Sequence, residues 1–133
     1  MSIFLKHTAL GFLAFAILDG LWLGVIMKEF YRDQLAPIAR MSDGGIAPVW
    51  SVAVVVYVLL GAGVAVFVVP RAVSLASAAF LGAALGLVIY GVYDLTNYST
   101  LARWPAAVTI ADILWGVVAT SLASMAIFAV STR

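Results

Sequence analysis

The chain has 133 residues, of which 65% are hydrophobic and 10% charged, and its formal net charge is +1. A soluble domain carries roughly a quarter charged residues, so this composition indicates a membrane protein, and the small net charge argues against a nucleic-acid partner. Cysteine is absent and histidine occurs once, at His7. Cysteine chemistry is therefore excluded, and we expect no metal site.

Four apolar stretches are each long enough to cross a bilayer as a helix, which takes roughly 20 residues. They run over residues 4–27, 47–69, 73–97 and 105–130. The four prolines lie in the connections or in the first turn of a stretch, where a helix tolerates them. The sequence therefore predicts one transmembrane domain over residues 1–133, an all-α, polytopic integral membrane protein that forms a compact antiparallel four-helix bundle.

The first stretch has one alternative reading, a cleaved signal peptide with Lys6 at its basic start. Asp19 and Trp22 interrupt the apolar run where the core of a signal peptide would be continuous. We therefore expect a membrane span.

The one long connection, residues 28–45, begins with KEFYRDQLAPIARM. It mixes aromatic and aliphatic side chains with charges, which suits a short helix lying at the membrane interface. A loop anchored by a few aromatic side chains is the alternative, and the sequence does not decide between them.

Three aspartates, Asp19, Asp94 and Asp112, are the ionisable residues clearly within the spans. Each costs about 2.5–3.5 kcal/mol at the centre of a span, and less near the interface. In an antiparallel bundle the end of the first span, the end of the third and the start of the fourth reach the same side. The three carboxylates are therefore predicted to converge on one polar pocket in one half of the membrane, with Asn97 in reach.

Aromatic and polar side chains in the same half are predicted to line this pocket. Asp19 and Trp22 are three residues apart, as are Asp112 and Trp115, so each pair shares a helix face. Tyr57 is assigned either to packing or to the pocket. The predicted ligand-binding residues are Asp19, Trp22, Tyr90, Tyr93, Asp94, Thr96, Asn97, Asp112 and Trp115.

Three arginines, Arg32, Arg40 and Arg103, leave the membrane on the side of the pocket. We expect them at the pocket mouth, where at least one pairs with a pocket aspartate or with a bound anion. The alternative for the aspartates is structural, in which each bonds a tyrosine, a tryptophan or the backbone and fixes the helix register.

Small residues recur at a spacing that permits close helix contact in membranes. Gly82 and Gly86 are four apart, as are Gly20 and Gly24. The spacing permits close contact at both pairs, but glycine is so frequent in polytopic proteins that this pattern alone predicts no particular interface.

The stretches DGLW, YGVYDLTN and ADILWG, in this order and spacing, resemble the bacterial membrane-protein family catalogued as domain of unknown function 2177. The resemblance covers nearly the whole chain and implies a multi-pass protein of the cell inner membrane, without an established activity or cofactor. This chain has Val92 where family members often have a threonine. The resemblance implies polar motifs at Asp19, Trp22, Tyr93, Asp94, Thr96, Asn97, Asp112 and Trp115.

Three classes of function fit these residues. The first is a binding or transport protein whose pocket holds a proton, a cation or a small amphipathic ligand. Four helices are few for alternating access, so a transporter would need a homo-oligomer. The second is a membrane enzyme that acts on a lipid-like substrate with aspartates as acid and base. The third is an assembly partner of another membrane protein. Membrane lipids are the expected surroundings, and we favour the first class.

Overall fold

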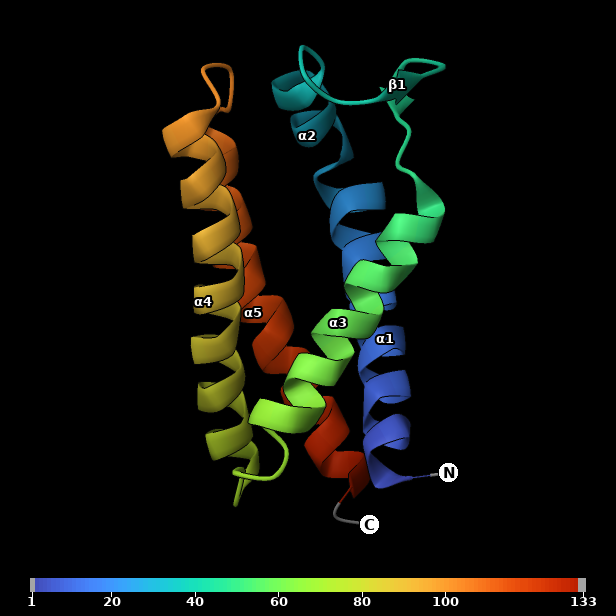
Figure 1. The fold of residues 1–133 in the computed structure, drawn as a ribbon, viewed down its shortest axis with the longest axis vertical. Coiled ribbons are helices and arrows are strands. Elements are labelled where there is room, and N and C mark those ends of the chain that lie inside the picture. The colour runs from blue at the N-terminus through green and yellow to red at the C-terminus, as the bar shows by residue number, and fades with distance from the viewer. Residues whose placement is uncertain (1, 132–133) are drawn as a thin grey trace.

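The structure, a computed structural model, describes residues 2–131 and contains four long helices that run alternately up and down (Figure 1). Both termini and the α3–α4 connection lie at one end, and α2 and the α4–α5 connection lie at the other. The predicted all-α four-helix bundle is confirmed. The long helices are α1 (Ile3–Leu21), continued by the π-helical turn η1 (Trp22–Ile26), then α3 (Trp50–Phe67), α4 (Leu75–Thr100) and α5 (Ala106–Ser131).

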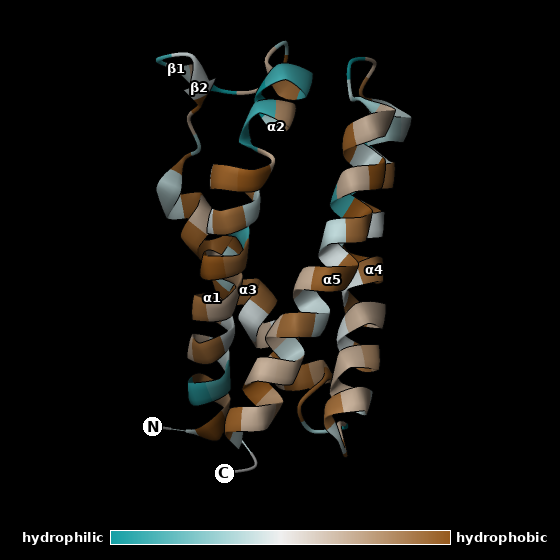
Figure 2. Cartoon of the chain, turned by 180° about the vertical axis from the view of Figure 1, so that it is seen from behind, coloured by the Kyte–Doolittle hydropathy of each residue, from teal (hydrophilic) through white to brown (hydrophobic). Residues whose placement is uncertain are grey.

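These helices are long and apolar enough to cross a membrane. Figure 2 shows them as mostly hydrophobic, with hydrophilic residues gathered at α2 and the neighbouring connections. Many large apolar side chains point outward, as in Ile17, Leu59 and Phe80, which are 63%, 65% and 74% exposed. Such an outer surface suits lipid as the solvent.

The long connection contains a helix and a small hairpin. The helix is α2 (Lys28–Leu35), which settles the open choice in favour of a short helix. Two strands follow, β1 (Met41–Ser42) and β2 (Gly45–Ile46), which pair antiparallel. Between them Asp43 and Gly44 have φ of 49° and 75°, as a tight two-residue hairpin turn requires. The hairpin was not predicted, although its Asp-Gly turn is visible in the sequence.

Helices α4 and α5 pack closely through small residues. A Cβ added at Gly82 would lie 2.7 Å from the carbonyl oxygen of Thr120 and from Cβ of Ser124. Gly86 faces Gly116 in the same way. The close contact that the spacing of Gly82 and Gly86 permits is therefore present.

Helices α1 and α3 form the second close pair, at Gly11 and Gly61. A Cβ on Gly61 would lie 2.5 Å from the carbonyl oxygen of Thr8. Gly20 and Gly24, by contrast, have nothing within 4 Å of an added Cβ. The spacing of Gly20 and Gly24 therefore marks no helix contact in this structure, and the close approach of α1 occurs nearer to the N-terminus, at Gly11.

The apolar core joins the two pairs in the half of the bundle that holds the termini. It contains Phe15 of α1, Val64 of α3, and Ala119, Ala123 and Ile127 of α5, each at most 1% exposed. The other half of the bundle is joined differently, by polar and aromatic contacts.

Replacing Gly86 by valine is expected to destabilise the α4–α5 pair. A Cβ at residue 86 would lie 2.8 Å from the carbonyl carbon of Gly116 and from Oγ1 of Thr120. Overpacking of this kind typically costs about 1–3 kcal/mol of unfolding free energy. The measurement is reversible unfolding in mixed micelles, with Gly20→Ala as the control because that position is open. Equal stability of Gly86→Val and the wild type would contradict the close contact.

Candidate functional site

The three intramembrane aspartates come from three helices and meet side chains of the remaining ones. We call this group the aspartate cluster, and it lies in the half of the bundle beneath α2. The cluster consists of Asp19, Trp22, Tyr31, Tyr57, Asp94, Asp112 and Trp115.

Asp19 of α1 is buried, at 7% exposed, and is supplied with a hydrogen-bond donor. Nε1 of Trp115 donates to its Oδ1 at 2.7 Å, which links α1 to α5. The hydroxyl of Tyr57, from α3, lies near the same carboxyl group. Since a donor from another helix binds this carboxylate, Asp19 fits the structural alternative well.

The two tryptophans at matched spacing stack on each other. The rings of Trp22 and Trp115 lie 4.5 Å apart between centroids and only 2° from parallel. Trp22 opens the π-helical turn, in which the N–H of Met27 donates to the carbonyl of Trp22 at 2.7 Å. The stacked rings of Trp22 and Trp115, together with the Trp115–Asp19 hydrogen bond, thus hold this end of the first span against α5.

Asp112 of α5 is covered by Tyr31, the buried residue of α2. The hydroxyl of Tyr31 donates to Oδ1 of Asp112 and accepts a hydrogen bond from Nε1 of Trp22 at 3.1 Å. The ring of Phe30 meets that of Tyr31 edge to face. Tyr31 therefore joins the interfacial helix to the aspartate cluster.

Tyr31 is not among the residues that the sequence predicts for the pocket. The mixture of apolar and charged residues in α2 indicates only an interfacial helix, in which Tyr31 reads as one of several anchors. Its role depends on how the chain turns after η1, which the sequence pattern does not give. Tyr57, left open between packing and pocket, contacts Asp19.

Asp94 of α4 is the most enclosed of the three aspartates, at 0% exposed. Its carboxyl group lies close enough to the carboxyl group of Asp112 for the two acids to interact. Within residues 2–131 no N–H or O–H donor reaches either oxygen of Asp94. Asp94 therefore faces a second acid and lacks the donors that Asp19 and Asp112 receive.

The other predicted residues of α4 divide between the cluster and its surroundings. Tyr90 packs its ring against Gly116 and is half-buried beside the cluster. Tyr93 is 56% exposed, and Asn97 lies near it along the helix. The ring of Tyr93 also meets Trp104 edge to face at 5.8 Å. Among the described residues, Asn97 forms no hydrogen bond with Asp94.

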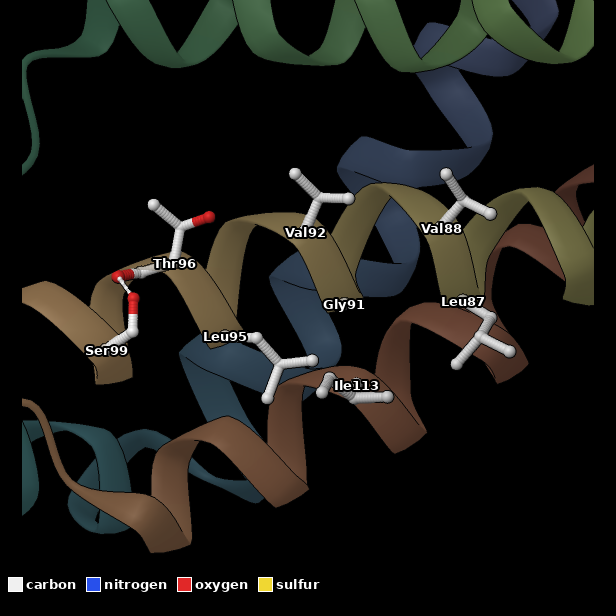
Figure 3. A pocket seen from close by; sticks show the side chains of 8 residues that line it. All are labelled: Leu87, Val88, Gly91, Val92, Leu95, Thr96, Ser99 and Ile113. Atoms are coloured by element: carbon white, nitrogen blue, oxygen red, sulfur yellow. Dashed lines mark hydrogen bonds between the residues drawn. The ribbon is translucent and has the colours of Figure 1, made fainter.

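Thr96 lies on the outer face of α4, because two residues along a helix turn the side chain by about 200° from Asp94. Thr96 lines a hollow of about 600 Å³. Gly91, Leu87, Leu95 and Ile113 also line this hollow. In Figure 3 Leu95 lies beside Ile113 of α5, whereas Thr96 points away from α5. No aspartate lines this hollow.

The three arginines are not paired with the aspartates of the cluster. Arg32 forms an ion pair with its neighbour Asp33 at 2.8 Å, and both side chains are exposed. Arg40 is exposed, and Arg103 lines a second hollow beyond Tyr93. Among the described residues no arginine forms an ion pair with a carboxylate of the cluster, so the predicted pairing is not seen.

Replacing Tyr31 by phenylalanine is expected to destabilise the fold by about 1–3 kcal/mol, because Asp112 and Trp22 both lose a buried hydrogen-bond partner. The measurement is unfolding in mixed micelles. Tyr98→Phe is the matched control, since Tyr98 is 53% exposed. An equal and small effect of both changes would show that the Tyr31 hydroxyl is not engaged in the folded protein.

The same pair of proteins gives a test at alkaline pH. Burial and the hydrogen bond to Asp112 raise the pKa of Tyr31 above its ordinary value of 10.0. A tyrosine with a higher pKa in the folded than in the unfolded state stabilises the fold fully below pH about 10, and this contribution is lost as the pH rises further. The free energy of unfolding of the wild type should therefore fall more steeply above pH about 10 than that of Tyr31→Phe. Parallel curves would contradict this.

Comparison with known proteins gives one match. No curated protein and no solved structure matches the chain significantly. A family model, described as predicted membrane protein (DUF2177), matches residues 4–129. The match covers all four long helices except the ends of the first and the last, and it bears out the resemblance noted in the sequence. The chain belongs to the DUF2177 family of predicted membrane proteins.

Proposed function

We propose that this multi-pass membrane protein binds and releases a proton at the carboxyl pair of Asp94 and Asp112. One observation carries the proposal. Asp94 is fully buried, its neighbour is the carboxyl group of Asp112, and no donor of the described residues reaches its oxygens. We place the protein in the inner membrane of a bacterial cell, as the resemblance to its family implies.

The physical argument concerns the cost of an uncompensated charge. A carboxylate removed from water without a partner costs several kcal/mol, and a second carboxylate beside it adds repulsion. A proton held between Asp94 and Asp112 removes one charge and supplies the missing hydrogen bond. The site is therefore suited to hold one proton.

Hydrogen bonds on the far side of Asp112 support this assignment. Trp22 donates to Tyr31, and Tyr31 donates to Oδ1 of Asp112. These two contacts stabilise negative charge on Asp112, so that a shared proton leaves the charge where donors are available. Asp94 is then the group that the proton neutralises.

A metal ion fits this site less well than a proton. Magnesium takes six oxygen ligands and calcium six to eight, whereas this pair offers two carboxyl groups. No group of three or more histidine, cysteine or acidic side chains placed to hold a metal occurs among the described residues. An amphipathic ligand or a lipid substrate would need a cavity that reaches Asp94, and neither of the two hollows beside α4 is lined by an aspartate.

Infrared spectroscopy of the protein in nanodiscs tests the proposal directly. The wild type is expected to give a carboxylic acid C=O band in the membrane-buried region that decreases as the pH is raised. Asp94→Asn should abolish this band, because it removes the acid that carries the proton. Asp112→Asn should shift the frequency of the band, because Asp94 keeps its proton but loses the carboxylate that accepts its hydrogen bond. The control is Asp43→Asn, since Asp43 is exposed in the hairpin turn and asparagine accepts its positive φ.

Stability separates this role from a structural one. Asp94→Asn is expected to change the free energy of unfolding by no more than about 1 kcal/mol, near the value of a hydrogen bond within a membrane. A band that persists unchanged in Asp94→Asn, or a large loss of stability in that variant, would contradict the proposal.

Vesicles that contain the protein and a pH-sensitive dye distinguish the two forms of the function. If the wild type carries protons across the membrane and Asp94→Asn does not, the site serves transport. If the wild type carries no protons, the site serves binding alone.

A further inference from the structure

A second hollow lies at the end of the bundle where α2 and the α4–α5 connection are found. It has a volume of about 630 Å³ and lies between the end of α2 and the segment from Thr100 to Trp104. Helix α4 ends at Thr100 and α5 begins at Ala106, so the hollow is at the level where two spans leave the apolar region. We call it the interfacial groove.

The lining of the interfacial groove is mostly apolar and includes one basic side chain. Leu35, Ile38 and Leu101 contribute aliphatic surface, and Arg103 contributes the positive charge. Within the described part of the chain, Arg103 forms no ion pair. A cationic side chain beside apolar surface at a membrane boundary is complementary to a lipid with an anionic headgroup.

Aromatic residues hold the wall of the groove in place. Nε1 of Trp104 donates to Oγ1 of Thr109 at 3.1 Å, which anchors the ring to the start of α5. Tyr93 meets the same ring edge to face, with the planes at 85°. Tryptophan and tyrosine favour the depth of the lipid headgroups, so both rings suit contact with a bound lipid.

We propose that the interfacial groove binds one anionic phospholipid, with the phosphate at Arg103 and the acyl chains along Leu35, Ile38 and Leu101. The arginine guanidinium binds phosphate through paired hydrogen bonds, and the apolar wall continues the environment of the bilayer. The proposal is independent of proton binding, because no aspartate lines the groove.

Native mass spectrometry of the protein in detergent tests the site. The probes are phosphatidylglycerol and phosphatidylcholine with identical acyl chains. The wild type is expected to bind phosphatidylglycerol in preference, with one lipid tighter than the rest. Arg103→Gln should weaken this binding about fivefold, the effect of one basic residue near a membrane surface. The control is Arg32→Gln, which removes the same charge from the same end but from a residue paired with Asp33.

A second substitution examines the apolar wall without loss of the arginine. Ile38→Glu places a negative charge in the groove and should also weaken phosphatidylglycerol binding. Ile38 is 42% exposed, and Ile46 in the hairpin is 40% exposed, so Ile46→Glu is the matched control. Equal preference in Arg103→Gln and the wild type would overturn the proposal. Binding of glycerol phosphate alone with the affinity of the lipid would overturn it as well, because the apolar wall would then contribute nothing.

Discussion

The structure depends on how a buried carboxylate obtains hydrogen-bond donors where water is scarce. Asp19 receives a donor from α5, and Asp112 receives its donor from α2. Each donor therefore comes from another element of the chain. The hydrogen bonds to these two carboxylates therefore also join α1 and α2 to α5 in this half of the bundle. Asp94, which has no such donor, contributes nothing to this joining and is available for another role.

The opposite end of the bundle is joined by a simpler polar contact. His7 of α1 is buried, and its Nε2 lies 2.7 Å from Oγ of Ser131 in α5. Between this contact and the aspartate cluster, Phe15 packs in the core with Ala119 and Ala123. Helices α1 and α5 are thus held by polar contacts at two levels and by apolar packing between them. With both helices fixed in this way, Asp112 is presented to Asp94 at a set position.

Much of this arrangement follows from the sequence, and the reasons are physical. Apolar length and the positions of the prolines predict the four helices, and antiparallel order then places Asp19, Asp94 and Asp112 in the same half of the membrane. The three-residue spacing of each aspartate and tryptophan predicts a shared face, and Trp22 does stack on Trp115. These predictions succeed because they need only helix periodicity and the thickness of a bilayer.

The remaining predictions needed rotations and turns that periodicity does not supply. Asn97 shares a face with Asp94 by spacing, yet among the described residues it forms no hydrogen bond with that carboxyl group. Thr96 lies in the same motif as Asp94 but on the opposite face. Tyr31 reaches the cluster only because η1 redirects the chain before α2. A π-helical turn inserts one extra residue into a helix, often at a functional site, and no composition rule locates it.

This redirection links the membrane surface to the acidic pair. Tyr31 is the buried residue of α2 and also donates a hydrogen bond to Asp112. A movement of α2 would therefore alter the hydrogen bonding of Asp112, the neighbour of Asp94. On the other side of α4, Tyr93 precedes Asp94 in the chain and contributes to the interfacial groove. The end of α2 lines that groove too. A lipid bound there would contact the two elements that flank the carboxyl pair, so its binding would act on the surroundings of the Asp94 carboxyl group.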